Sequence, residues 1–141
     1  MSGESQRRAD ARRRQELATA AAGAEARQAQ EQLTAFVARL QADEVAPEPL
    51  QATLLNGTRV KTGLVGWYLN RARTLAVAPD GSYYQLVTAG SALARFTGVR
   101  VEPSPPTLVI GRGGRDGETG DLADFLARAA AEYSGRKPKG P

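Results

Sequence analysis

The stretch LVGWYLNRARTLAVAPDGSYYQLV, residues 64–87, decides how this chain of 141 residues folds. It holds the single tryptophan and three of the four tyrosines. Leu75 and Val77 alternate with alanines over 75–78, Tyr84 and Leu86 alternate with their neighbours over 83–87, and the turn sequence Pro79-Asp80-Gly81 lies between the two runs. A period of two on both sides of a glycine-containing turn predicts a β-hairpin. We expect this aromatic-rich hairpin to be the nucleus of the core.

Further short strands are predicted on both sides of this hairpin. Asn56-Gly57 lies between two β-prone runs, which indicates a hairpin with a type I′ turn. In addition to the central hairpin, the expected strands cover 51–55, 58–62, 63–69, 96–102 and 107–110, and a short helical turn is expected at 91–95. Five or six strands followed by one helix predict an antiparallel α+β domain over 51–133. We favour a small, partly open SH3-like barrel; a flat sheet covered by the C-terminal helix is the alternative.

Residues 1–43 are predicted to form a long N-terminal helix with a basic, frayed start. They lack proline and are rich in alanine, glutamine, glutamate and arginine, which favour helix. A weak heptad seam runs over 22–40, and its bulky members are Leu33, Phe36, Val37 and Leu40. This seam either docks on the chain's own domain or pairs with a helix of a second copy or of a partner. Residues 44–50, with two prolines, are predicted to be a linker.

A second helix is predicted to begin at Asp121, which is a favourable N-cap residue. Its apolar face has helical spacing and consists of Leu122, Phe125, Leu126, Ala129 and Tyr133. Ser134-Gly135 is expected to end this helix. Residues 134–141 are then expected to form a disordered basic tail.

The chain contains no cysteine and no histidine, which excludes several kinds of chemistry. Disulfides, Cys/His zinc sites, thiol nucleophiles and Ser-His-Asp triads all need one of these residues. The glycine-rich stretch 111–120 lacks the Lys-Ser/Thr pair of a phosphate-binding loop, so it is expected to be a connecting loop. We therefore expect a protein without catalytic residues, metal ligands or a cofactor.

The sequence also bears on location. No apolar run approaches the ~20 residues that cross a bilayer, and the N-terminus lacks the apolar region of a secretory signal. We expect a cytoplasmic protein with no membrane partner.

The predicted strands are strongly basic. The net charge of the chain is +4, and residues 49–101 contain six basic residues and a single acidic one. Basic side chains beside exposed aromatic rings on a small β-fold are typical of single-stranded nucleic acid binding. The candidate contacts are Arg59, Lys61, Tyr68, Arg71, Arg73, Tyr83 and Arg100. Part of the excess reflects an Arg-, Ala-, Gly- and Pro-rich composition that is typical of a GC-rich bacterial genome.

Two hypotheses for function follow from these patterns. The first is a non-catalytic interaction or adaptor protein, in which a basic β-rich domain recognises a protein partner and the N-terminal helix docks or forms a homodimer. The alternative is a nucleic-acid-binding protein that uses the basic and aromatic residues of the strands. The positions of Tyr68 and Tyr83 discriminate between them, because only exposed rings can stack on bases.

Overall fold

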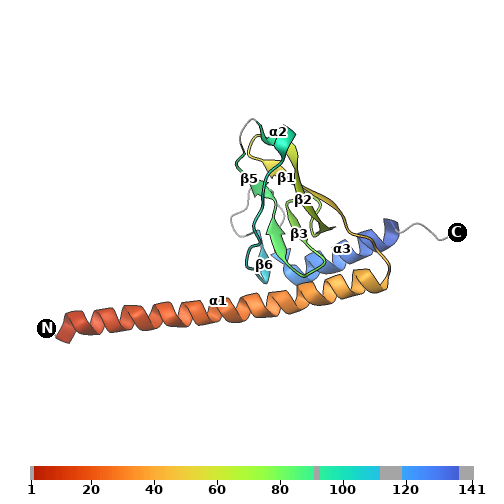
Figure 1. Ribbon diagram of the computed structural model, residues 1–141. Helices are drawn as coiled ribbons and strands as arrows, with labels where there is room; N and C mark the ends of the chain where they lie inside the picture. The colour runs from red at the N-terminus through yellow and green to blue at the C-terminus, as the bar shows by residue number, and fades with distance from the viewer. Residues whose placement is uncertain (1, 91–92, 112–118, 137–141) are drawn as a thin grey trace.

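The computed structural model describes residues 2–90, 93–111 and 119–136, and Figure 1 shows how its elements are arranged. In chain order these are α1 (Ser2–Ala42), β1 (Glu48–Leu54), β2 (Arg59–Tyr68), β3 (Leu75–Val77), β4 (Tyr83–Gln85), β5 (Val87–Thr88), α2 (Ala94–Thr97), β6 (Val109–Ile110), β7 (Gly120–Asp121) and α3 (Leu122–Arg136). The predicted α+β class is confirmed. None of the helices in the described part of the chain has the length and apolar character that a membrane span needs.

The main sheet has the strand order β4-β3-β2-β1-β5 and is mixed rather than antiparallel. The first three pairings along the chain are antiparallel, whereas β5 pairs with β1 in parallel. Leu86 is the single residue between β4 and β5, so the two outermost strands of the sheet are consecutive in the chain. Its N–H donates to the Thr74 carbonyl at 2.7 Å, and its carbonyl accepts from the Thr53 N–H at 2.6 Å. The sheet is therefore curled, with its two edges joined at Leu86.

The β1–β2 hairpin forms as expected, but its turn differs from the prediction. The Gly57 N–H donates to the Leu54 carbonyl at 2.8 Å, and Gly57 has φ of 87° while Asn56 does not have a positive φ. This geometry is a turn followed by a left-handed glycine, not type I′. The linker prediction is also wrong at its end, since β1 begins at Glu48. Pro49 is tolerated in the strand because the register shifts between it and Gln51.

Beyond β5 the strand predictions are less accurate. The predicted strand over 96–102 is absent, because its first two residues belong to α2 and the rest has no regular structure. Val99 and Val101 nevertheless pack against the core, as their shared apolar face predicts. The predicted strand 58–62 and the predicted strand 63–69 are one bent strand, β2. The predicted strand 107–110 is reduced to β6, which pairs with β7 outside the main sheet.

The apolar face predicted for the C-terminal helix is buried in full, but α3 continues to Arg136, so the predicted end at Ser134-Gly135 is wrong. The remaining tail, 137–141, lies outside the described residues, as does 112–118 of the glycine-rich stretch.

Each face of the sheet carries its own cluster of buried apolar residues. The inner face of the curl holds residues such as Tyr68, Tyr84 and Leu86. The other face presents Trp67 and Tyr83 to α1 and α3. Successive residues of a strand point to opposite faces. Because both faces are covered, neither of the adjacent tyrosines 83 and 84 reaches solvent.

The C-terminal half of α1 docks on its own domain. Leu33, Phe36, Val37 and Leu40 are buried together with Trp67 and residues of α3. These four side chains are therefore buried within one chain, which agrees with the first of the two alternatives, docking of the seam on its own domain. Helix α1 has 41 residues, about 60 Å at 1.5 Å per residue, and its N-terminal half extends away from the domain (Figure 1).

Candidate interaction surface

The two tyrosines predicted to stack on nucleic acid are buried. Tyr68 is 8% exposed and Tyr83 is 2% exposed. Burial raises the pKa of the Tyr83 hydroxyl to about 12, since its charged form loses solvation there. The Tyr68 hydroxyl accepts a hydrogen bond from the Gln51 N–H at 2.8 Å. Both residues are part of the core, so the prediction that they face a ligand is wrong.

Three of the predicted basic residues gather around the buried ring of Tyr68. The guanidinium carbons of Arg59 and Arg73 lie 5.9 Å and 5.6 Å from its ring centroid, which are cation–π distances. Arg71 is close by and donates from Nε to Glu132 Oε1 at 3.3 Å. The cluster covers Tyr68 and includes a carboxylate. It is thus partly neutralised within the protein and suits a structural role.

Lys61 and Arg100 lie apart from that cluster. The Val99 N–H donates to the Lys61 carbonyl at 2.8 Å, so the segment after α2 runs beside the start of β2. Arg100 Nε lies 3.3 Å from Glu102 Oε1, and both side chains are highly exposed. Such exposed pairs contribute little. The seven predicted contact residues therefore do not form one surface.

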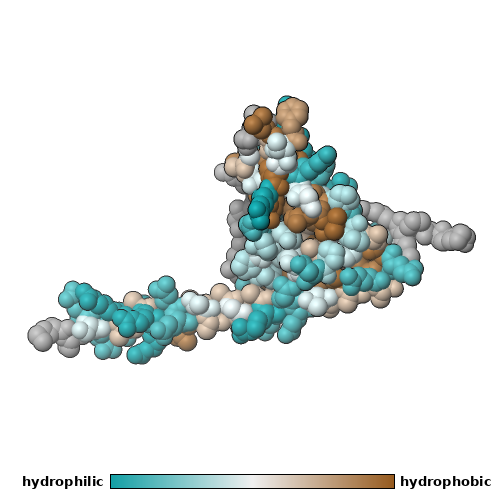
Figure 2. All heavy atoms as spheres, in the orientation of Figure 1, coloured by the Kyte–Doolittle hydropathy of each residue, from teal (hydrophilic) through white to brown (hydrophobic). Residues whose placement is uncertain are grey.

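A different surface, which the sequence patterns did not reveal, lies at the end of the domain opposite α1. Leu55 in the β1–β2 turn is 77% exposed, Leu93 at the start of α2 is 66% exposed, and Phe96 within α2 is 79% exposed. Val87 in β5 is also exposed. Figure 2 shows apolar residues gathered over this end, above a largely hydrophilic flank. We call these four residues together with Arg95 the tip surface.

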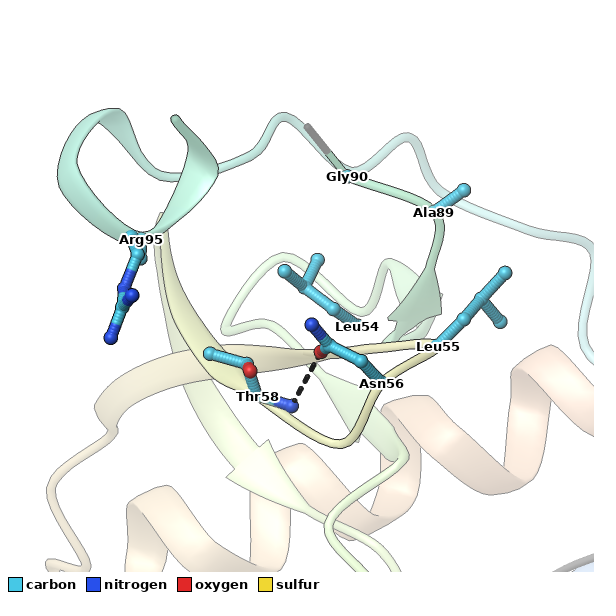
Figure 3. Close-up of a pocket in the computed structure, with 7 residues that line it drawn as sticks. All are labelled: Leu54, Leu55, Asn56, Thr58, Ala89, Gly90 and Arg95. Atoms are coloured by element: carbon cyan, nitrogen blue, oxygen red, sulfur yellow. Dashed lines mark hydrogen bonds between the residues drawn. The ribbon is translucent and has the colours of Figure 1, made fainter. Parts of the chain in front are cut away.

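A cavity of about 450 Å³ opens within the tip surface. It lies between the β1–β2 turn and residues 89–90, with Arg95 of α2 beside it (Figure 3). Its lining residues are Leu54, Leu55, Asn56, Thr58, Ala89, Gly90 and Arg95. Asn56 Oδ1 accepts from the Thr58 N–H at 2.9 Å, which fixes the turn.

The segment above the cavity packs closely on its floor. A Cβ atom added at Gly90 would lie 2.6 Å from Leu54 Cδ2 and 3.2 Å from the Ala94 Cβ. The small residue at position 90 therefore lets this segment pass over Leu54. The cavity is lined by the aliphatic side chains of Leu54, Leu55 and Ala89 and by the polar residues Asn56, Thr58 and Arg95, of which Arg95 is charged.

Sequence reasoning missed the tip surface because it assigned Phe96 to a half-buried strand. One signal was present: Leu54 and Leu55 are consecutive leucines where a strand enters a turn. Alternation buries only one of such a pair. The structure buries Leu54 and exposes Leu55.

No group of three or more acidic residues that could hold a metal ion occurs in the described part of the chain. Comparison with protein-family models, with curated proteins and with solved structures finds no match to this chain.

Proposed function

We propose that this protein is a non-catalytic interaction module that binds a segment of another protein at the tip surface. The observation that carries the proposal is the exposure of Leu55, which lines the cavity, and of Leu93 and Phe96, which lie within two residues of the lining residue Arg95. Apolar side chains scattered singly are normal on a surface, whereas a group of them beside a concave site marks a binding site. The tip surface also faces away from α1, so a partner can approach it freely (Figure 1).

The expected affinity is modest. Full burial of a large apolar side chain contributes about 1.5–3 kcal/mol, so three such residues contribute roughly 5–9 kcal/mol. The loss of translational and rotational freedom on association costs about 4–15 kcal/mol and so offsets much of this favourable term. Contacts with the backbone and with polar groups must supply the rest. We therefore expect dissociation constants in the micromolar range or weaker.

The architecture supports this proposal. A curled sheet with its two edges joined at Leu86 and an apolar cluster inside it is consistent with a small barrel of the SH3-like kind. Surface loops positioned by a rigid scaffold are a common location for binding residues. The docked half of α1 then stabilises the module. The projecting half acts as a spacer between the module and a structure bound by the N-terminus.

Binding of single-stranded nucleic acid is a second candidate, supported by one observation. Phe96 is the one aromatic residue that is exposed in the described part of the chain, and the Arg95 guanidinium carbon lies 5.8 Å from its ring centroid. An exposed ring beside an arginine is a minimal stacking platform. A single ring gives little binding energy, about 1–3 kcal/mol, so we rank this function second.

Selection of binders from a random peptide display library on the immobilised full-length protein tests the proposal. We expect selected peptides whose binding, measured by fluorescence polarisation, falls at least about tenfold in Leu93→Asp or Phe96→Asp, because each change places a charge in the apolar contact. Leu17→Asp is the matched control, since Leu17 is 65% exposed but lies in the projecting half of α1. Failure to select any peptide, or peptides that bind Leu93→Asp normally, would refute the proposal.

A further inference from the structure

The charges around the tip surface point to one chemical class of partner. We infer that the bound segment is acidic, with an apolar anchor residue flanked by aspartate or glutamate. This inference rests on the proposed function and narrows it. It depends on where the basic and acidic groups of the β-domain lie relative to the cavity.

Two basic residues lie on α2 or on the strand that packs beside its end. Arg95 is part of the cavity wall. Lys61 is close to the end of α2, since a Cβ atom added at Gly98 would lie 2.8 Å from the Lys61 carbonyl oxygen. Within the described ranges, neither Arg95 nor Lys61 has a carboxylate within ion-pair distance. Two positive charges are therefore available to a partner.

The acidic groups of the β-domain are held at the opposite end. Asp80 is in the β3–β4 turn, and that turn contacts α1 through the Gln30 side-chain N–H, which donates to the Gly81 carbonyl at 2.7 Å. The Ser82 N–H donates to Asp80 Oδ1 at 2.9 Å and lowers the pKa of that carboxyl. Glu48 accepts from the Tyr133 hydroxyl of α3 at 2.6 Å. Asp80 and Glu48 therefore lie on the side of the domain that faces α1 and α3, away from the cavity.

Glu102 pairs with Arg100. This pair leaves the charges of Arg95 and Lys61 unbalanced. A partner that buried the leucines of the tip surface without supplying a negative charge would bring these cations towards a less polar environment. That desolvation is unfavourable unless each cation gains a partner.

Arg95 is well placed to select a carboxylate. Its guanidinium lies against Phe96, so a charged group and an apolar group are adjacent on one surface. Guanidinium binds carboxylate through two parallel hydrogen bonds, a geometry that lysine does not provide. An acidic residue next to an apolar anchor would satisfy both at once. The aliphatic walls around Leu54 and Leu55 favour a peptide side chain over a nucleobase, which needs flat rings on which to stack.

The test uses the same selection, with a library in which acidic and basic residues are equally frequent. We expect peptides selected on the full-length protein to be net acidic, and their binding to weaken as salt is added. Arg95→Glu should reduce the affinity of these peptides about five- to tenfold and shift a fresh selection towards basic peptides. Arg128→Glu is the matched control: its guanidinium carbon also lies close to a phenylalanine ring, 5.1 Å from the Phe125 centroid, but on α3. It should change the affinity less than about twofold.

The outcomes separate this inference from the function on which it rests. Neutral or basic selected peptides whose binding is lost in Leu93→Asp would overturn the acidic partner while the interaction module stands. Selection of no peptide would overturn both. A labelled single-stranded oligonucleotide that binds the wild type and not Arg95→Glu, in the absence of any selected peptide, would assign the tip surface to nucleic acid instead.

Discussion

Removal of one hydroxyl group from α3 should destabilise the whole fold. The Tyr133 hydroxyl donates to Glu48 Oε2 at 2.6 Å and accepts from the Tyr68 N–H at 2.7 Å. It thereby joins the C-terminal helix to the start of β1 and to the end of β2. In Tyr133→Phe both hydrogen bonds are lost, and the buried Tyr68 N–H is left without this partner.

The magnitude follows from these two contacts. A hydrogen bond to a charged group contributes about 1.5–3 kcal/mol, and a buried donor left without a partner costs about 1–3 kcal/mol. The two effects share one hydroxyl and are not fully additive. We expect the free energy of unfolding to fall by about 2–4 kcal/mol, a large part of the roughly 5–15 kcal/mol that stabilises a typical domain.

Urea unfolding followed by tryptophan fluorescence measures this loss. Trp67 is the single tryptophan and is fully buried between the sheet and the helices, so its emission reports on the packing that Tyr133 supports. Tyr84→Phe is the matched control, because the buried Tyr84 makes no side-chain hydrogen bond within the described part of the chain; we expect a loss below about 0.5 kcal/mol. Adding Glu48→Ala completes a double-mutant cycle, with an expected coupling of at least about 1 kcal/mol.

A loss below about 0.5 kcal/mol in Tyr133→Phe would contradict the assigned network. Equal losses in the variants at positions 133 and 84 would do so as well, because they would show that ring packing and not the hydroxyl is responsible.

Three further predictions concern the helix, the pH dependence and the glycines. A protein lacking residues 1–21 should be monomeric in sedimentation, and its free energy of unfolding should lie within about 0.5 kcal/mol of that of the full chain. Leu33→Ala should lower the free energy of unfolding by about 2–5 kcal/mol. Association that depends on residues 1–21 would contradict this prediction. In the folded protein the pKa of Tyr83 is raised from 10.0 to about 12. The stabilising contribution of the protonated hydroxyl is therefore complete below pH 10 and is lost as the pH rises towards 12. The free energy of unfolding measured between pH 10 and 12 should fall more steeply in the wild type than in Tyr83→Phe, and parallel curves would refute this prediction. Gly66→Ala forces its Cβ against a backbone carbonyl of β3 and should destabilise by about 1–3 kcal/mol or more, whereas Gly23→Ala in open helix should stabilise by about 0.5–1 kcal/mol. A Gly66→Ala protein that is as stable as the wild type in thermal unfolding, or more stable, would contradict the close approach at β3.

The elements that sequence reasoning predicted correctly depend on short-range interactions. The long α1, the β3–β4 hairpin and the apolar face of α3 all agree with the structure. Helix propensity, the period of two around Pro79-Asp80-Gly81 and the helical spacing from Leu122 to Tyr133 act within a few residues of one another. Such interactions do not depend on what the rest of the chain does.

The elements that it missed depend on contacts between distant segments. The parallel pairing of β5 with β1 comes from closure of the curl at Leu86, where hydrogen bonds to Thr53 and Thr74 join residues far apart in sequence. The segment expected to be a strand over 96–102 donates from the Val99 N–H to the Lys61 carbonyl of β2 but forms no strand, and Val99 and Val101 keep their predicted apolar role. Hydrogen-bonding partners of a strand are not encoded in its own alternation.

The candidate site was missed for a related reason. Alternation correctly placed Tyr83 and Tyr84 on opposite faces, and the expectation that one of them is exposed assumed that a single face of the sheet is covered. With α1 and α3 over one face and the curl enclosing the other, both rings are buried. Among the aromatic rings of the described residues Phe96 is exposed, and it lies with Leu55 at the end of the domain away from α1 and α3.

The sequence by itself determined the helices, the central hairpin, the lack of cysteine and histidine chemistry, and the basic character of the strands, because these are properties of composition and of local period. Only the tertiary structure decided that the seam of Leu33 and Phe36 is satisfied within one chain, that the tyrosines are core residues, and that Arg95 stands beside an apolar cavity. Burial is a property of the surfaces that meet when distant segments pack, and a local pattern specifies which side chains share a face but not what covers that face.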